Sequence, residues 1–278
     1  MKAGKLLLAA AGSLVAAGTL GFSSVAAAPT ARLGPAAIAP GVDGARAAGS
    51  VEYSRNWSGY VSTVTSLKTP RPFTSVQAEW TERAYGCNGE SPEAAVVWVG
   101  LDGWNGNTVE QGGTYEACDG TAQGTHYAWW EMYPTNSITE VFAVNVGDRM
   151  YASVTYGPPG HPGAFKIVVT DKTSRRGFTE FEKCQDVAGC PRSSAEWIVE
   201  RPSYGGAYSA LPQWAPFMGF TDGMARVQTR HAWESAVARF PSFAVDMVND
   251  ADTEDMATAA APGVRRPVLT DVWQSYGP

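Results

Sequence analysis

Residues 126–134 read HYAWWEMYP, the most informative strand-like run in the sequence. Successive side chains on a β-strand point to opposite faces of the sheet. One face carries three aromatic rings and a carboxyl group, and the other carries His126 and apolar side chains: Tyr127, Trp129, Glu131 and Tyr133 against His126, Ala128, Trp130 and Met132. Because an unpaired carboxylate is costly to bury, the first face favours the floor of a groove that holds an extended ligand. The alternative is a packed face on which Glu131 accepts hydrogen bonds from a neighbouring strand.

Short alternating runs of the same kind recur from residue 51 onward, separated by turn residues such as Gly147-Asp148. Only residues 230–239 (RHAWESAVAR) have a helical period, and the acidic residues 249–256 are expected to form an exposed loop. Many short strands with few helices predict an all-β fold, namely a two-sheet antiparallel β-sandwich of the jelly-roll or concanavalin type. We assign this domain to residues 51–278.

Residues 96–103, VVWVGLDG, repeat the alternation. Trp98, Gly100 and Asp102 share one face of the expected strand. The core-facing side chains are those of Val97, Val99 and Leu101. Since Gly100 has no side chain, it is expected to leave room for a group to approach the backbone between Trp98 and Asp102.

Two further runs place polar groups at the ends of apolar stretches. Residues 194–200, SAEWIVE, put Glu196 and Glu200 on the same face of a strand that is otherwise typical of a buried one. Residues 109–113, VEQGG, put Gln111 before two glycines, where an amide can point into a cleft without crowding. Taken alone, such a glutamine is more often a surface residue.

The composition excludes several partner classes. The 278-residue chain has a net charge of -6, only 17% charged residues, and many Gly, Pro and Trp residues. No basic stripe is visible, so we expect no nucleic-acid partner. The low charge and the high Gly and Pro content are typical of a globular, turn-rich β protein.

The N-terminal residues predict export from the cell. Residues 1–28 combine a basic start at Lys2 and Lys5, an apolar run over 6–20 and small residues before Pro29, as in a signal peptide. A membrane anchor is the alternative, but the apolar run is short and diluted by Gly and Ala. Residues 29–50 lack aromatic residues and periodicity, so we assign them to a propeptide or disordered linker. The mature protein is therefore expected to be secreted and extracellular, with no membrane contact after removal of the signal.

The four cysteines fit an exported protein with two disulfides. Three pairings are open, and the short turn between Cys184 and Cys190 favours Cys184–Cys190 together with Cys87–Cys118. A zinc site is the alternative, but no cysteine pair has the two-residue spacing typical of one, and the three histidines are scattered.

Several hydrolase motifs are missing from the sequence. It contains no G-x-S-x-G nucleophile elbow, no H-E-x-x-H zinc motif and no aspartic-protease D-[ST]-G signature. His126 belongs to the face opposite the Tyr-Trp-Glu row, which leaves no strong candidate for a Ser-His pair. A hydrolase built on this sequence must therefore rely on carboxyl and amide groups, with no metal or cofactor.

Six motifs together resemble the glutamic peptidases, or eqolisins, in order and approximate spacing. The motifs are RNWSGYV (55–61), WVGLDG (98–103), VEQGG (109–113), AWWEMYP (128–134), VGDRM (146–150) and AEWIVE (195–200). The resemblance implies a β-sandwich with its active site on a concave sheet, and a pepstatin-insensitive acid endopeptidase. It places the catalytic pair on Gln111 and Glu200. It also places the substrate-binding residues on Trp57, Trp98, Asp102, Trp129, Glu131 and Tyr133. One departure is Glu110, where a leucine is usual in the family.

The implied mechanism uses one acid and one amide. Glu200 would take a proton from water and deliver it to the leaving amine, while Gln111 stabilises the oxyanion. A free glutamate titrates near about pH 4.3, so an acidic optimum is expected. Glu131 and Asp102 would position Gln111. Substrates would be proteins or peptides, and we expect a monomer.

Two other classes remain open from the sequence. A jelly-roll glycoside hydrolase could use Glu131 and Glu200 as its two carboxyl groups, and a carbohydrate-binding protein could use the tryptophans alone. Residues 56–58 also form a glycosylation sequon, but we expect Asn56 to lie in a packed strand without a glycan.

Overall fold

The computed structural model describes residues 51–64, 71–89, 92–104, 106–118, 124–186, 189–228, 234–235, 242–260 and 269–277. The expected signal peptide and the segment 29–50 lie outside these residues. Of the two compact units of the chain, Met1–Ala31 and Arg32–Pro278, the second contains all of them.

The described residues form strands and turns, with no helix among them. The strands are β1 (Val51–Ser54), β2 (Trp57–Thr63), β3 (Phe73–Thr81), β4 (Tyr85–Gly86), β5 (Ala94–Leu101), β6 (Val109–Ala117), β7 (Thr125–Tyr133), β8 (Thr139–Ala143), β9 (Arg149–Tyr156), β10 (Ala164–Asp171), β11 (Arg176–Lys183), β12 (Ser194–Glu200), β13 (Ser203–Tyr204), β14 (Ala207–Tyr208), β15 (Gln213–Trp214), β16 (Met218–Val227), β17 (Glu234–Ser235), β18 (Ser242–Val248), β19 (Asp255–Ala260) and β20 (Leu269–Trp273).

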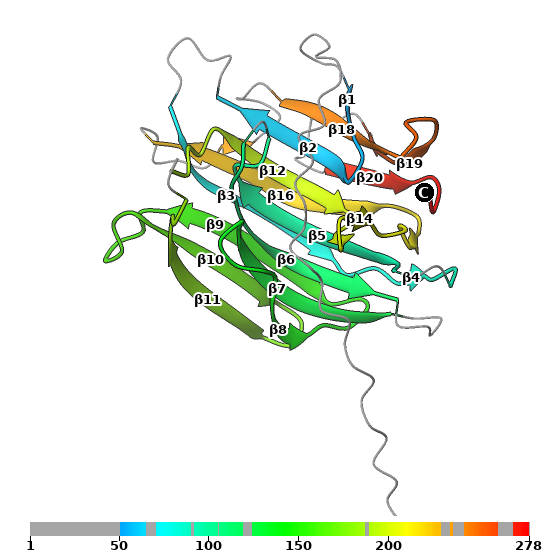
Figure 1. Cartoon of the computed structure of the whole chain (residues 1–278). Coiled ribbons are helices and arrows are strands. Elements are labelled where there is room, and N and C mark those ends of the chain that lie inside the picture. The colour runs from blue at the N-terminus through cyan, green and yellow to red at the C-terminus, as the bar shows by residue number, and fades with distance from the viewer. Residues whose placement is uncertain are drawn as a thin grey trace, which may run out of the picture. The chain divides into compact units, whose positions relative to one another are not determined.

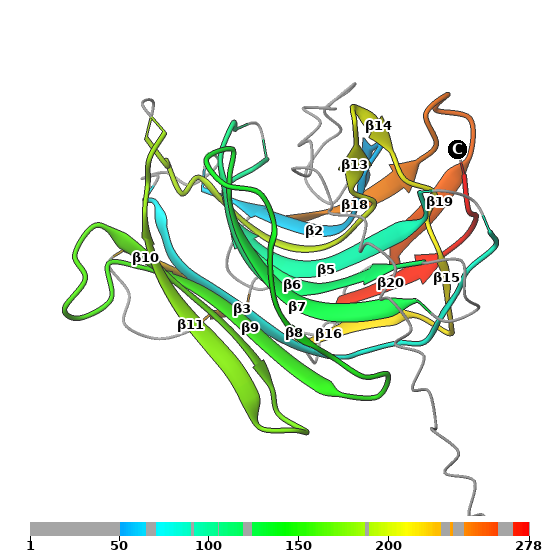
Figure 2. The same ribbon diagram turned by 60° about the horizontal axis from the view of Figure 1, so that its bottom comes forward.

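Two layers of strands pack face to face. One layer runs in the order β18-β2-β12-β5-β6-β7-β8, and the other in the order β11-β10-β9-β3-β16 (Figure 1). Nearly all neighbouring strands are antiparallel; β1 pairs with β18 in parallel. Figure 2 shows the first layer strongly curved, with the second layer on its convex side. The predicted all-β sandwich is confirmed.

β16 connects the two layers. Its first residues, Met218–Phe220, pair with β20, which continues through β19 to β18 in the first layer. From Thr221 onward β16 pairs with β3 of the second layer, with a register shift between Thr221 and Met224. Asp222 lies inside this irregularity with a φ of 53°. A bulge re-aims a strand and lets it change sheets, so the hydrogen-bonded path is continuous from β11 to β8.

The core between the layers consists of the apolar faces that the alternation predicted. Val97, Val99 and Leu101 of β5 lie in it, while Trp98 belongs to a second cluster on the opposite face of the same strand. β7 divides in the same way. Ala128 and Met132 lie in the core between the layers, and Trp129 lies in the second cluster.

The sequence was less informative at two chain segments. Only Glu234 and Ser235 of the helical-period run 230–239 are described, and they form β17 against β16, so the helix prediction is wrong there. The expected loop 249–256 is a turn that ends where β19 begins at Asp255. No helix in the described part of the chain is long and apolar enough to cross a membrane.

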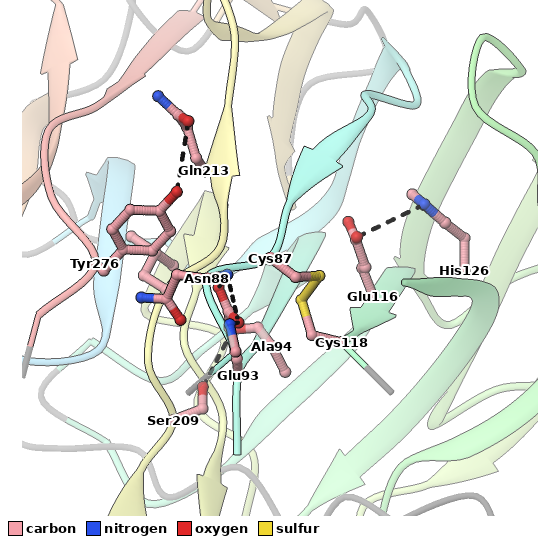
Figure 3. Close-up of a disulfide and its surroundings, with 12 residues drawn as sticks. Cys87, Asn88, Glu93, Ala94, Glu116, Cys118, His126, Ser209, Gln213 and Tyr276 are labelled. Atoms are coloured by element: carbon pink, nitrogen blue, oxygen red, sulfur yellow. Dashed lines mark hydrogen bonds and ion pairs between the residues drawn. A yellow bond between two sulfur atoms is a disulfide. The ribbon is translucent and has the colours of Figure 1, made fainter. Parts of the chain in front are cut away.

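Both disulfides join the favoured pairs, Cys87–Cys118 and Cys184–Cys190. Figure 3 shows the first of them beside Glu116 and His126. His126 Nε2 lies 3.8 Å from Glu116 Oε1, and its Nδ1 lies 2.9 Å from Glu82 Oε1. His126 therefore points into the interior between the layers, away from the aromatic row, as the alternation predicted.

Candidate active site

The concave face of the first layer collects the aromatic and polar groups that the sequence singled out. Its apolar members include Trp57, Trp98, Val109, Trp129 and Ile198. The strands β2, β12, β5, β6 and β7 lie side by side across this face, and β13 and β14 stand above it (Figure 2). This arrangement places groups far apart in sequence within one surface.

Glu200 is the last residue of β12, between Trp57 of β2 and Val96 of β5. Asn56 Nδ2 donates to its Oε1 at 3.0 Å, and Trp98 Nε1 donates to its Oε2 at 2.9 Å. Each carboxyl oxygen is thus held by a separate N–H donor. Residue Glu200 is 1% exposed.

Burial sets the protonation state of Glu200. It raises the pKa of Glu200 to about 8, against opposing hydrogen bonds from Trp98, Asn56 and Trp57. The free-glutamate value from which the acidic optimum was expected therefore does not apply to Glu200. Because removing the carboxylate from water outweighs the donors, Glu200 carries a proton throughout the acidic range.

Gln111 and Glu131 face each other across β6 and β7. Gln111 Nε2 donates to Glu131 Oε2 at 2.8 Å, so Glu131 contacts Gln111 as predicted. Burial and then the charge of Glu200 raise the pKa of Glu131 well above its ordinary range, and the bond from Gln111 opposes them. Among the described residues, Gln111 Oε1 and Glu131 Oε1 have no hydrogen-bond partner. Gln111 therefore keeps a free acceptor and a second N–H for a ligand.

Trp98 occupies the floor between Glu200 and Gln111. Along β5, the residues opposite Glu200 and Gln111 are Val96 and Gly100, which are about 13 Å apart on an extended strand. A Cβ on Gly100 would lie only 2.8 Å from Cζ3 of Trp98. The space expected above Gly100 is thus filled by the Trp98 ring, which corrects the prediction of an open approach to the backbone.

The other predicted aromatic residues lie around this floor. Trp57 meets Trp98 edge to face with ring centroids 5.0 Å apart. Trp129 lies opposite Gly113 and is buried, whereas Tyr133 is half-buried at the end of β7. Among the described residues, the indole nitrogen of Trp129 has no acceptor. This donor and the free oxygens of Gln111 and Glu131 give the face polar groups suited to a peptide backbone.

Asp102 does not join this group. Its carboxyl accepts the backbone N–H groups of Arg192 at 2.6 Å and Ser193 at 2.7 Å. Burial and then the charge of Asp102 raise the pKa of Glu110 well above its ordinary range. Asp102 therefore holds the 192–193 segment beside Glu110 and Glu196, and none of the hydrogen bonds among the described residues joins it to Gln111.

Sequence reasoning missed three contributors to this face. Asn56 was considered only as a sequon, yet it is buried and bonded to Glu200, which also agrees with the expected absence of a glycan. Trp104 packs against Phe243, with ring centroids 4.9 Å apart. Tyr204 of β13 reaches Tyr115, with hydroxyl oxygens 3.4 Å apart. For Asn56, the available signal was a polar residue directly before a buried strand.

One group of described residues has the spacing of a metal site, namely Cys87, Glu116 and Cys118. Two of its three members are joined in a disulfide, and disulfide sulfurs are not thiolate ligands. Glu116 of this group lies next to His126, which points into the interior between the layers rather than to the concave face (Figure 3). The chemistry of the concave face thus involves carboxyl, amide and indole groups.

Comparisons with known proteins identify the family and the fold. A family model described as the Peptidase A4 family matches residues 55–256. Scytalido-glutamic peptidase with a transition state analog inhibitor is 18% identical, with 80% of this chain and 99% of that chain covered and a TM-score of 0.64. The eqolisin SCP-B in complex with the tripeptide Ala-Ile-His is 17% identical, with the same coverages and a TM-score of 0.61.

A third solved structure, aspergilloglutamic peptidase from Aspergillus niger, is 20% identical, with 66% of this chain and 99% of that chain covered and a TM-score of 0.53. At these identities the likeness shows the fold. No curated protein sequence matches this chain.

Proposed function

Because this chain belongs to the peptidase A4 family and is a glutamic-type peptidase, we propose that it is a secreted acid endopeptidase with Gln111 and Glu200 as its catalytic pair. The observation that carries the proposal is the environment of Glu200. A buried carboxyl group, held on both oxygens by N–H donors, shares a face with the Gln111–Glu131 pair. Such an environment is typical of a proton-transferring group rather than a structural ion pair.

The raised pKa of Glu200 determines the order of proton transfers. In acid, Glu200 starts protonated and donates its proton to the carbonyl oxygen of the peptide bond. At the same time a water molecule attacks the carbonyl carbon. Gln111 accepts a hydrogen bond from this water through Oε1, and its second N–H stabilises the negative charge that develops on the substrate oxygen.

The remaining steps return the enzyme to its starting state. The Glu200 carboxylate takes a proton from the attached water and gives it to the amide nitrogen, so that the C–N bond breaks and the amine leaves. The protonated acid product then returns one proton to Glu200. Each proton is accounted for, and Glu200 acts alternately as acid and base.

Several finer properties belong to the same proposal. Pepstatin is not expected to inhibit, because the proposed pair is an amide and one carboxyl group rather than two carboxyl groups. Residues 1–28 would be removed as a signal peptide, and residues 29–50 would be a propeptide or linker before the peptidase domain 51–278. The two disulfides support an extracellular location, and we propose a monomer that acts on protein or peptide substrates.

Family membership decides against the glycoside hydrolase and the carbohydrate-binding protein. The contacts favour the same conclusion. Glu131 accepts its hydrogen bond from Gln111 rather than standing free as a second catalytic acid. An amide in that position suits an oxyanion better than a sugar ring oxygen.

The decisive experiment compares Glu200→Gln with the wild-type enzyme. We expect cleavage of a denatured protein with pepstatin present, highest in acid and falling as the pH rises towards 8, where Glu200 loses its proton. Glu200→Gln keeps the shape of the side chain but cannot transfer a proton, so activity should be abolished at every pH from 2 to 9.5.

Glu196→Gln is the matched control, because Glu196 is buried on the same face of the same strand but neighbours Asp102 and Glu110. It should retain activity. If Glu200→Gln cleaves as well as Glu196→Gln, Glu200 is not the catalytic acid.

A further inference from the structure

Asn56 is the residue that contacts Glu200 from the segment between β1 and β2. Its Nδ2 donates to Glu200 Oε1 at 3.0 Å, and the residue is fully buried. Assuming the proposed role of Glu200, we propose that Asn56 is a positioning residue that fixes the Glu200 carboxyl group for proton transfer. Asn56 does not itself touch the reacting atoms.

The orientation of the Asn56 amide is determined by Ser54. Ser54 Oγ donates to Asn56 Oδ1 at 3.1 Å, and it accepts the backbone N–H groups of Asn56 and Trp57. Since the amide oxygen is engaged by a donor, the amide nitrogen must be the group that faces Glu200. Asn56 therefore presents a donor to the carboxyl group, and only a donor.

Arg201 attaches this segment to β12. Its backbone N–H donates to Asn56 O at 2.9 Å, and its side-chain Nε donates to Arg55 O. The Arg201 side chain is buried, and its other nitrogens bond to Ser209 O and to Asp250. Arg201, the residue directly after Glu200, thus anchors the backbone that carries Asn56. Its two hydrogen bonds to Arg55 and Asn56 fix the distance between Asn56 and Glu200.

Asn56 and Trp98 together fix the plane of the carboxyl group. Trp98 Nε1 occupies Oε2 and Asn56 Nδ2 occupies Oε1, so rotation of the carboxyl group would break both bonds. The acidic proton then lies on a remaining lone pair, where a bound peptide can receive it. Proton transfer is sensitive to such alignment, because the reacting atoms must approach in a narrow range of geometry.

The electrostatic surroundings of Glu200 are simple enough for a pH test. Glu131 of β7 and Tyr208 of β14 are the titratable groups whose charges couple to Glu200. Asn56 is uncharged, and its hydrogen bond lowers the pKa of Glu200 against the larger effect of burial. Loss of the bond should raise that pKa further, whereas loss of a merely structural contact would leave it unchanged.

The test measures kcat, KM and the pH profile of Asn56→Ala. A hydrogen bond to a charged group is worth enough to move a pKa by about one unit. We expect the basic limb of the profile to move upward by about one pH unit and kcat to fall at least about tenfold, with KM nearly unchanged. Ser54→Ala frees the Asn56 amide without removing it and should shift the limb less, in the same direction.

Asp252→Asn is the control for this segment, since it removes the carboxylate charge from the exposed pair with Arg55, and it should change neither kcat nor the basic limb of the pH profile. If the basic limb of the pH profile does not move in either Asn56→Ala or Ser54→Ala, the inference is overturned. If Asn56→Ala does not fold, the inference is tested by the basic limb of the pH profile of Ser54→Ala: an unmoved limb overturns it. These outcomes concern Asn56 alone, because the proposed function itself fails only if Glu200→Gln remains active.

Discussion

Trp98 shows how one side chain serves two groups of the site. Its indole N–H holds Glu200, and the far edge of its ring covers the backbone at Gly100, opposite Gln111. Trp57 meets the same ring edge to face and supports it from β2. The orientation of the Glu200 carboxyl group therefore depends on aromatic packing that involves no charged partner, so it persists when the site is protonated in acid.

Gln111 can be tested at the same scale. Gln111→Ala removes the proposed oxyanion donor and the acceptor for water, so we expect kcat to fall by about 10²–10³ with a smaller change in KM. Steady-state kinetics on one peptide would measure both. Glu131→Gln still offers an oxygen to Gln111 and should have a smaller effect. Equal losses in the two variants would contradict the assigned role of Gln111.

At the level of elements, the pairing of β5 and β6 depends on the glycine doublet that follows Gln111. A Cβ on Gly113 would lie 1.9 Å from the backbone oxygen of Val97, because the two strands and Trp98 meet closely there. A Cβ on Gly112 points the other way and would meet side-chain methyl groups of Ile167 and Val169 at 2.8 and 3.1 Å. A side chain is thus excluded at Gly113 by the backbone of the neighbouring strand and at Gly112 by side chains of the core.

The adjacent variants Gly112→Ala and Gly113→Ala separate these reasons. Methyl groups can shift, so Gly112→Ala should cost about 1–3 kcal/mol of unfolding free energy. A backbone carbonyl in a paired strand cannot shift without breaking the ladder, so Gly113→Ala should cost more and also lower activity. Denaturant unfolding measures the difference, and a Gly113→Ala enzyme as stable as Gly112→Ala would contradict the close approach of β5 and β6.

For the whole molecule, the pH dependence of stability is set by the buried carboxyl groups that stay protonated in the folded protein. Burial raises the pKa of Asp271 to about 7, of Glu200 to about 8 and of Glu116 to about 10. Burial also raises the pKa of three further glutamates well above the ordinary value: Glu110, Glu131 and Glu196. Five of these groups lie on β6, β7 and β12 of the first layer, and Asp271 lies on β20.

The direction of the pH effect follows from proton binding. Below about pH 3 both the folded and the unfolded chain keep these groups protonated. As the pH rises from about 4 to 8, the unfolded chain ionises while the folded protein retains its protons, so the free energy of unfolding falls. We therefore expect a higher melting temperature at pH 4 than at pH 8, measured by calorimetry.

Asp271→Asn tests the origin of this effect, since it removes one group that titrates in the window. It should flatten the decline of the melting temperature between pH 4 and 7. A melting temperature that rises towards pH 8 would contradict the burial of these carboxyl groups. In strong acid Asp252 acts in the opposite sense, because its hydrogen bond from Arg55 lowers its pKa.

Much of the architecture could be predicted from local patterns. The alternation in 96–103 and 126–134 correctly divided each strand between the interior and the concave face, because side-chain direction depends only on the strand period. The contact of Glu131 with Gln111 was also anticipated. The helix over 230–239 was wrong at Glu234 and Ser235, since pairing with β16 overrides local periodicity. Asp102 was assigned to the site from its face and from the family resemblance, and its left-handed backbone, with a φ of 68°, ends that alternation.

From the sequence alone followed the all-β sandwich, the favoured disulfide pairs that the structure contains, and the family motifs that predict Gln111 and Glu200 as the catalytic pair. The groups that surround Glu200, and the rise of its pKa, depend on the tertiary structure. Its two donors, Asn56 and Trp98, lie 144 and 102 residues away in the chain, so no local pattern records the contacts. Burial, which raises the pKa of Glu200 to about 8, is likewise a property of the packed sheets, because it depends on how much water the neighbouring strands exclude.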